Sequence, residues 1–96
     1  MSYKLAFDSR VKKDSANIGK KNSTIIMEIL SEFARNFNYK YEQELLKTTK
    51  IKALKDAYAG LYRLRIGSFR AIYTKKDDEL IILVLRVVAR KDAYKG

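Results

Sequence analysis

The chain has 96 residues, with 21 lysines and arginines against 11 aspartates and glutamates, which gives a formal net charge of +10 and a sequence pI near 9.9. Such an excess in a small protein favours a polyanionic partner, nucleic acid first and an acidic protein second. The absence of cysteine and histidine excludes disulfides, thiolate nucleophiles, Ser-His triads and cysteine-ligated zinc. No apolar leader or membrane-spanning stretch is present, so we expect a cytoplasmic protein without a membrane partner.

The N-terminal half predicts one strand and two helices. Residues 3–7 form the expected opening strand, and Asp8 is the expected N-cap of a helix that runs to about Ile18 and stops at Gly19. Apolar side chains then recur every three or four residues, which predicts a second helix whose apolar stripe a sheet must cover. The stripe consists of Ile25, Ile26, Ile29, Leu30, Phe33, Ala34 and Phe37. Residues 36–50 fit either a short third helix at 41–47 or a loop.

Residues 61–73 carry the strongest local signal in the chain, a β-hairpin. Two alternating runs flank a Gly-Ser turn at 67–68, and this turn places Arg65 opposite Arg70. Because side chains alternate between the two faces of a strand, the apolar residues share one face while these two arginines and Arg63 share the other. Like charges opposite each other cost a few tenths to about 1 kcal/mol, so a phosphate between them would reverse the sign of the interaction.

The remaining strands complete the predicted fold. A short strand at 51–54 leads into the hairpin, and residues 79–89 form a β-branched and leucine-rich run that is typical of a central strand covered on both faces. We expect an α+β fold in which an N-terminal strand and two helices precede a mostly antiparallel sheet, with residues 1–96 forming a single domain. The positive charge is concentrated in the strand-rich half, because residues 50–96 hold 12 basic and 5 acidic side chains.

The last strand decides whether the arginines of the chain meet. Arg86 and Arg90 join the face of Arg70 only if the turn at 75–79 has an odd number of residues or the strand contains a bulge. With an even turn and no bulge, Arg90 points to the other side unless the chain bends after Ala89.

The stretch from residue 52 to residue 94 resembles the C-terminal half of the RelE/ParE toxin superfamily, the toxic partners of toxin–antitoxin pairs. It reads KALKDAYAGLYRLRIGSFRAIYTKKDDELIILVLRVVARKDAY, and the resemblance rests on the hairpin, the apolar strand and the arginine and tyrosine of the tail. It implies a ribosome-dependent mRNA endonuclease that cuts by attack of a ribose 2′-hydroxyl on the adjacent phosphate, without a metal or another cofactor. It also allows the gyrase-inhibiting branch, which keeps the fold without the nuclease residues.

The resemblance implies roles for individual residues: Arg65, Arg70, Arg90 and Tyr94 in catalysis, and Lys52, Lys55, Arg63 and Lys91 in RNA binding. Guanidinium groups suit this chemistry because they bind bidentately to the charge that gathers on a phosphate in the transition state. Tyr94 can stack on a base or help to move a proton. Arg65 stands where the family has a candidate lysine base, and arginine stays protonated. The proton acceptor therefore stays open among Tyr94, Lys52, Lys55 and a ribosomal group.

Alternative interpretations concern the same residues. Arginines on one strand face are, by themselves, more often a solvated face than a site, so a non-catalytic nucleic-acid-binding domain remains an alternative beside the nuclease and the gyrase inhibitor. The acidic residues at 77–79 predict a turn rather than a metal site. The toxin hypotheses imply a ribosome and mRNA as partners and an acidic antitoxin that folds onto the apolar and basic surface, with the toxin alone monomeric and larger assemblies formed with the antitoxin.

Overall fold

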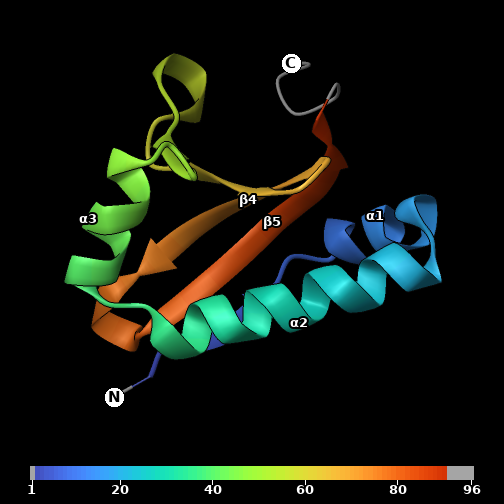
Figure 1. Cartoon of the computed structure of the whole chain (residues 1–96), viewed down its shortest axis with the longest axis horizontal. Coiled ribbons are helices and arrows are strands. Elements are labelled where there is room, and N and C mark those ends of the chain that lie inside the picture. The colour runs from blue at the N-terminus through green and yellow to red at the C-terminus, as the bar shows by residue number, and fades with distance from the viewer. Residues whose placement is uncertain (1, 91–96) are drawn as a thin grey trace.

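The computed structural model describes residues 2–90, which form a five-stranded mixed sheet with three helices. The helices are α1 (Arg10–Ile18), α2 (Lys20–Asn36) and α3 (Tyr39–Lys47), and the strands are β1 (Lys4–Phe7), β2 (Ile51–Ala53), β3 (Tyr62–Ile66), β4 (Phe69–Lys76) and β5 (Ile81–Ala89). The strand order is β1-β5-β4-β3-β2, with β1 parallel to β5 and all other pairs antiparallel. The predicted α+β fold is thereby confirmed (Figure 1).

The first helix begins close to the predicted position. The Asp8 carboxylate accepts a hydrogen bond from the backbone N–H of Arg10 at 3.0 Å, which satisfies one of the free donors of the first turn. The residue next to the helix is Ser9, whose side chain makes no such bond. Gly19, with φ of 91°, ends α1 and starts α2, since only glycine adopts this backbone conformation at no steric cost.

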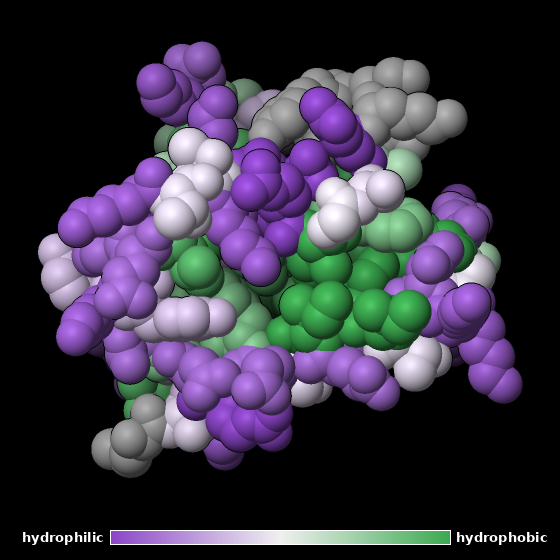
Figure 2. Space-filling model, viewed as in Figure 1, coloured by the Kyte–Doolittle hydropathy of each residue, from purple (hydrophilic) through white to green (hydrophobic). Residues whose placement is uncertain are grey.

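Helix α2 covers one face of the sheet, which we call the helix-covered face. Ile26, Leu30, Phe33 and Ala34 are buried there, and the Phe33 ring meets the Tyr73 ring of β4 edge-on at 5.5 Å between centroids. The predicted stripe is too wide for this contact, however, because Ile25 and Ile29 remain 47% and 37% exposed. An apolar area is visible on one side of the molecule, over the region of α2 (Figure 2).

Residues 39–47 are helical, which decides between the two interpretations of this segment. The Asn38 side chain caps α3 by accepting a hydrogen bond from the N–H of Tyr41 at 2.8 Å. The buried Glu42 of this helix bonds the Nζ of Lys75 in β4 at 2.7 Å, and this ion pair joins α3 to the sheet. The same ammonium lies over the rings of Phe37 and Tyr62.

Strand β5 contains a bulge that was not predictable from its apolar pattern. Ile72 of β4 pairs with Arg86 while Tyr73 pairs with Val84, so Leu85 is the extra residue. Even-numbered residues of β5 face the helices before the bulge, and odd-numbered ones do so after it. The prediction that β5 is covered on both faces is only half right: Ile82, Val84 and Val87 are buried, whereas the other residues of the strand are half-exposed.

No helix within residues 2–90 is long and apolar enough to cross a membrane.

Candidate nucleic-acid interface

The face of the sheet opposite the helix-covered face carries basic side chains from four strands, and we call it the arginine face. The ladder places Lys52 of β2 opposite Arg63 of β3, Arg63 opposite Ile72, and Ile72 opposite Arg86 of β5. A second row crosses Arg65 of β3, Arg70 of β4 and Val88 of β5. None of the described strand positions on this face is acidic. The two rows therefore present positive charge to any ligand that approaches this side of the sheet.

Arg65 and Arg70 lie directly opposite each other, as the hairpin predicts. Arg65 is exposed, whereas Arg70 is only 6% exposed. The Nη1 atom of Arg70 donates hydrogen bonds to the carbonyl oxygens of Gly67 and Phe69, both at 2.9 Å. These two hydrogen bonds hold the guanidinium group in a fixed direction beside the hairpin turn, and such preorganisation favours anion binding.

Arg63 occupies a different environment from its neighbours on the same face. It is only 8% exposed, its Nη2 atom donates to the carbonyl oxygen of Thr49 at 2.5 Å, and its Nε atom is buried without a hydrogen-bond partner. Thr49 has φ of 61°, a costly conformation for a β-branched residue. The contact ties the turn between α3 and β2 to the middle of β3. Arg63 thus supports the structure in a way that its strand position alone does not reveal.

Arg90 follows β5 at the end of the hairpin turn. Its backbone N–H donates to the carbonyl oxygen of Ser68 at 2.8 Å, and its side chain is exposed. Leu85 is an extra residue in β5, so the even-numbered residues that follow it in the strand lie on the arginine face. Val88, which pairs with Arg70, is one of them. The turn between β4 and β5 consists of the four residues 77–80, an even number. The structure therefore follows the predicted alternative with a bulge in the strand. Lys91 and Tyr94 lie outside the described residues.

Two of the three lysines in the predicted RNA-binding set lie within the described residues, and both are exposed. Lys52 lies on β2, and Lys55 lies in the loop between β2 and β3. This loop is held to the sheet where the Oγ1 atom of Thr74 donates to the carbonyl oxygen of Gly60 at 3.1 Å. Within residues 2–90, no group of acidic side chains is arranged to hold a metal ion, and residues 77–79 form a 3₁₀ turn as predicted.

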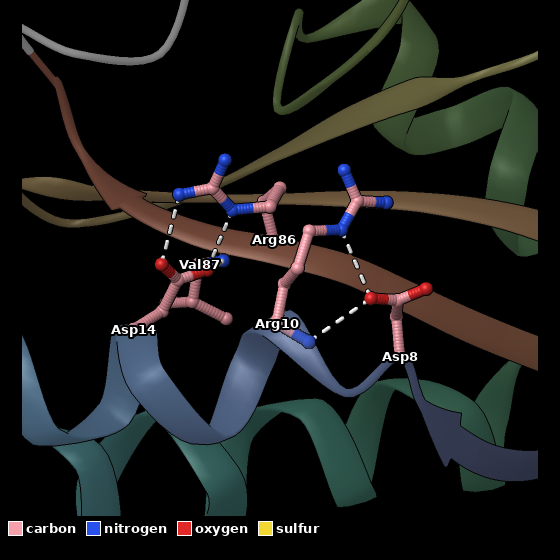
Figure 3. A network of polar contacts seen from close by, with 5 residues as sticks. All are labelled: Asp8, Arg10, Asp14, Arg86 and Val87. Carbon is pink, nitrogen blue, oxygen red and sulfur yellow. Dashed lines mark hydrogen bonds and ion pairs between the residues drawn. The ribbon is translucent and has the colours of Figure 1, made fainter.

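The structure adds a residue pair to which the sequence reasoning gave no role. Asp14 of α1 is 5% exposed, and its two carboxylate oxygens accept hydrogen bonds from Nε and Nη2 of Arg86, both at 2.9 Å (Figure 3). One of these oxygens also accepts the backbone N–H of Val87 at 3.0 Å. The sequence signal for Asp14 was its spacing of three residues from the buried Val11, which puts a carboxylate on the inward side of a helix.

Electrostatics at this pair follow from burial and hydrogen bonding. Burial alone would raise the pKa of Asp14, but the hydrogen bonds from Arg86 and from the N–H of Val87 outweigh it, so the pKa lies below its ordinary value. The hydrogen bond to Asp14 raises the pKa of Arg86. Both groups are therefore charged at neutral pH.

An apolar groove lies on the helix side of the molecule, between α2 and α3. Its lining combines apolar and charged side chains: Ile29, Phe33, Tyr41, Leu45 and Leu64 with Glu28, Glu32 and Lys50. An amphipathic segment of another protein fits such a surface, because its apolar side chains can bury area that the groove leaves open.

Comparison with known proteins relates this geometry to a family. The family model described as the ParE toxin of the type II toxin–antitoxin system parDE matches residues 5–94. A curated protein of Methanocaldococcus jannaschii, named "Putative toxin RelE1", is 29% identical over 96 residues, which is all of this chain and 99% of the relative.

Solved structures show the same fold. The RelBE2 toxin–antitoxin complex of Mycobacterium tuberculosis contains a chain that is 23% identical with a TM-score of 0.68, and the match covers 94% of this chain and 100% of that one. The archaeal RelE–RelB complex of Pyrococcus horikoshii contains a chain that is 21% identical with a TM-score of 0.68, covering 97% and 100%. The protein therefore belongs to the RelE/ParE superfamily of type II toxin–antitoxin toxins.

Proposed function

We propose that this toxin is a ribosome-dependent mRNA endonuclease, which cuts the message by attack of a ribose 2′-hydroxyl on the adjacent phosphate. The observation that carries the proposal is the pairing of the exposed Arg65 with the largely buried Arg70 on the arginine face, with the exposed Arg90 directly after β5. Two guanidinium groups that face each other on neighbouring strands supply donors from both sides to an anion bound between them. A phosphate in the transition state carries the charge that these donors fit.

Each residue has a definite part in this reaction. Arg70, held by two carbonyl groups of the turn, contacts the scissile phosphate in a fixed direction. Arg65 and Arg90 add donors from either side, and Tyr94 stacks on a base or passes a proton. Lys52, Lys55 and Lys91 hold the RNA backbone, and Arg63 joins them mainly by keeping the strands in place. The reaction needs no metal, because arginines supply the charge that a metal would otherwise provide.

A cognate antitoxin is the natural second partner. Similar proteins were solved as RelE–RelB toxin–antitoxin complexes, and an acidic antitoxin matches the charge of +10 of this chain. An apolar helix of the antitoxin would fill the groove between α2 and α3, and an acidic segment would cover the arginine face. The toxin alone would be a cytoplasmic monomer, and larger assemblies would form with the antitoxin.

A second candidate function is inhibition of DNA gyrase. It is favoured by one observation, the match of residues 5–94 to the model of the ParE toxin. In that case the arginine face would contact gyrase or its DNA rather than mRNA, and no bond in RNA would be broken.

Expression in cells separates these functions. After brief induction, the 5′ ends of a translated message and of the same message without a start codon are mapped, and plasmid supercoiling is measured in parallel. The nuclease hypothesis expects new ends only in the translated message and unchanged supercoiling. Arg70→Ala, Arg90→Ala and Tyr94→Phe should each abolish most of the cleavage, whereas Arg35→Ala, which removes an exposed arginine on α2, should not.

Loss of supercoiling with intact messages would establish the gyrase alternative instead. A protein that binds RNA, harms no cell and leaves both messages intact would be a non-catalytic binding domain, and its affinity would fall steeply with salt.

A further inference from the structure

Arg86 reaches the arginine face only because of the bulge at Leu85. Without this extra residue, Arg86 would lie on the same side as Val84, inside the core. With it, Arg86 stands opposite Ile72, at the end of the row that starts with Lys52 and Arg63. The same register change puts Val88 on this face, and Arg90 follows directly after the end of β5.

The guanidinium group of Arg86 is held in a fixed direction and remains accessible. Asp14 receives two of its five N–H donors, from Nε and Nη2, and the side chain of Arg86 is 42% exposed. Figure 3 shows the Arg86 guanidinium rising above β5, away from α2, with Asp14 below it. The three remaining N–H donors are thus available to a ligand on the arginine face.

A second ion pair of the same kind stands beside it. The Nε atom of Arg10 bonds the Asp8 carboxylate at 2.9 Å, and its guanidinium group lies on the same side of β5 as that of Arg86 (Figure 3). In each pair, the carboxylate accepts a hydrogen bond from the Nε atom of the arginine and so holds its guanidinium group in place. Each pair is formally neutral, and each holds its guanidinium group in a fixed direction on the side of the sheet nearest α1.

A purely structural role would be anchoring of α1 to β5. Asp14 performs this anchoring through the N–H of Val87, an edge donor that lies beyond the last β1–β5 pair, Phe7 with Val84. That contact does not involve the Arg86 side chain. The Nη1 group and the second Nη2 hydrogen of Arg86, which Asp14 does not receive, are left for a partner outside the chain.

We infer that Arg86 is a phosphate-binding residue, oriented by Asp14, which contacts an RNA phosphate next to the one bound by Arg65 and Arg70. This assignment deepens the proposed function and rests on it. Arg86 and Arg70 lie on neighbouring strands two residues apart in register, which separates their Cα atoms by roughly 8 Å. Two long side chains at this separation can engage successive phosphates of one strand. Arg86 binds and positions the RNA and takes no part in breaking the bond.

The test compares Arg86→Gln with Arg35→Gln, which removes an arginine from an exposed ion pair with Glu32 on α2. Binding is measured with a single-stranded RNA of the cleaved sequence whose attacking 2′-hydroxyl is replaced by hydrogen, and cleavage is measured on ribosomes programmed with the unmodified message. Arg86→Gln should weaken binding and raise KM about tenfold, with kcat nearly unchanged. It should also lower the slope of log affinity against log salt by about 0.7, the value for one phosphate contact.

Rescue distinguishes binding from anchoring. Arg86→Lys, which keeps the charge but loses the fork, should restore the salt slope and part of the affinity, and Arg35→Gln should match the wild type. An unchanged affinity and salt slope in Arg86→Gln, with only a lower Tm, would overturn the assignment, as would a loss confined to kcat. If the wild type binds the probe but cleaves no message, the proposed function fails, while the binding comparison still decides the role of Arg86.

Discussion

The two faces of the sheet are built from the same strands and have opposite chemistry. On the helix-covered face, Leu64, Ala71 and Tyr73 are at most 1% exposed and pack against α2. On the other face, the neighbouring residues of the same strands are Arg63, Arg65 and Arg70, together with Ile72. Since strand side chains alternate, burial of the apolar set fixes the position of the charged set. The fold therefore places positive charge in one layer without needing any favourable contact between the charges.

The arginine face is itself divided. Arg63, Arg70 and Arg86 are bound by acceptors of the protein itself, whereas the side chain of Arg65 is exposed. Substitutions on the helix-covered face should therefore change stability, and those at the exposed arginine should change activity. Substitutions at the bound arginines should show, residue by residue, whether the side chain serves stability or activity.

The largest expected effect is the loss of catalysis in Arg70→Ala. Removing one preorganised donor from a transition-state site lowers kcat by about 10² to 10³-fold. The rate of message cleavage on programmed ribosomes measures this loss, and the Tm shows that the variant is folded. A rate within about twofold of the wild type would mean that Arg70 only supports the hairpin turn.

The matching change on the helix-covered face is Leu30→Ala. Leu30 is fully buried, so its truncation should lower the free energy of unfolding by about 2–5 kcal/mol. Ile29→Ala, at the adjacent and 37% exposed position, should cost less than about 1 kcal/mol. Urea unfolding of both variants checks the difference, and equal losses would contradict the assignment of the two helix faces.

A smaller effect distinguishes two arginines of one strand. Arg63→Gln should lower the free energy of unfolding by about 1–3 kcal/mol, because it leaves the Thr49 carbonyl group without its donor. Arg65→Gln should leave stability within about 0.5 kcal/mol of the wild type, since Arg65 is exposed, but should weaken RNA binding and its salt dependence. If Arg65→Gln destabilised the fold as much as Arg63→Gln, the division of the arginine face would be wrong.

The smallest expected effect is a pH dependence of stability that originates at Asp14. Its pKa is lowered in the folded state, so its contribution is complete above the unfolded value near 3.9 and is lost as the pH falls through the folded value. Asp14→Asn should therefore be less stable than the wild type at neutral pH and approach it in acid. Thermal unfolding between neutral and acidic pH tests this, with Glu32→Gln, which breaks an exposed pair, as the control. Parallel curves for wild type and Asp14→Asn would assign the acid sensitivity to other groups.

Features that depend on neighbouring residues, such as the hairpin register, were predictable from the sequence. Features that depend on contacts between distant residues were not. The Gly-Ser turn fixed the hairpin register, because a two-residue turn leaves one pairing, and Arg65 stands opposite Arg70 as expected. The bulge at Leu85 could not be located, since it lies inside a continuous apolar run where either parity can be buried. Burial of Arg63 depends on the turn at Thr49, which is 14 residues away.

The helix α3 could have been predicted with more certainty from the sequence. Asn38 directly before an alternation of charged and apolar residues is an N-cap signal, and the structure uses it in this way. The pairing of Asp14 with Arg86 joins residues 72 positions apart, and no local pattern announces such a contact.

The central claim is that the arginine face, and not the helix-covered side, contacts the message. A photo-cross-linking experiment tests it directly: a message that carries 4-thiouridine at the mapped cleavage site, with the attacking 2′-hydroxyl replaced by hydrogen, is bound to ribosomes with the toxin and irradiated. Mass spectrometry then locates the linked peptide. The account predicts cross-links within the hairpin at 61–73 or at the end of β5, and cross-links confined to α2 and α3 would contradict it.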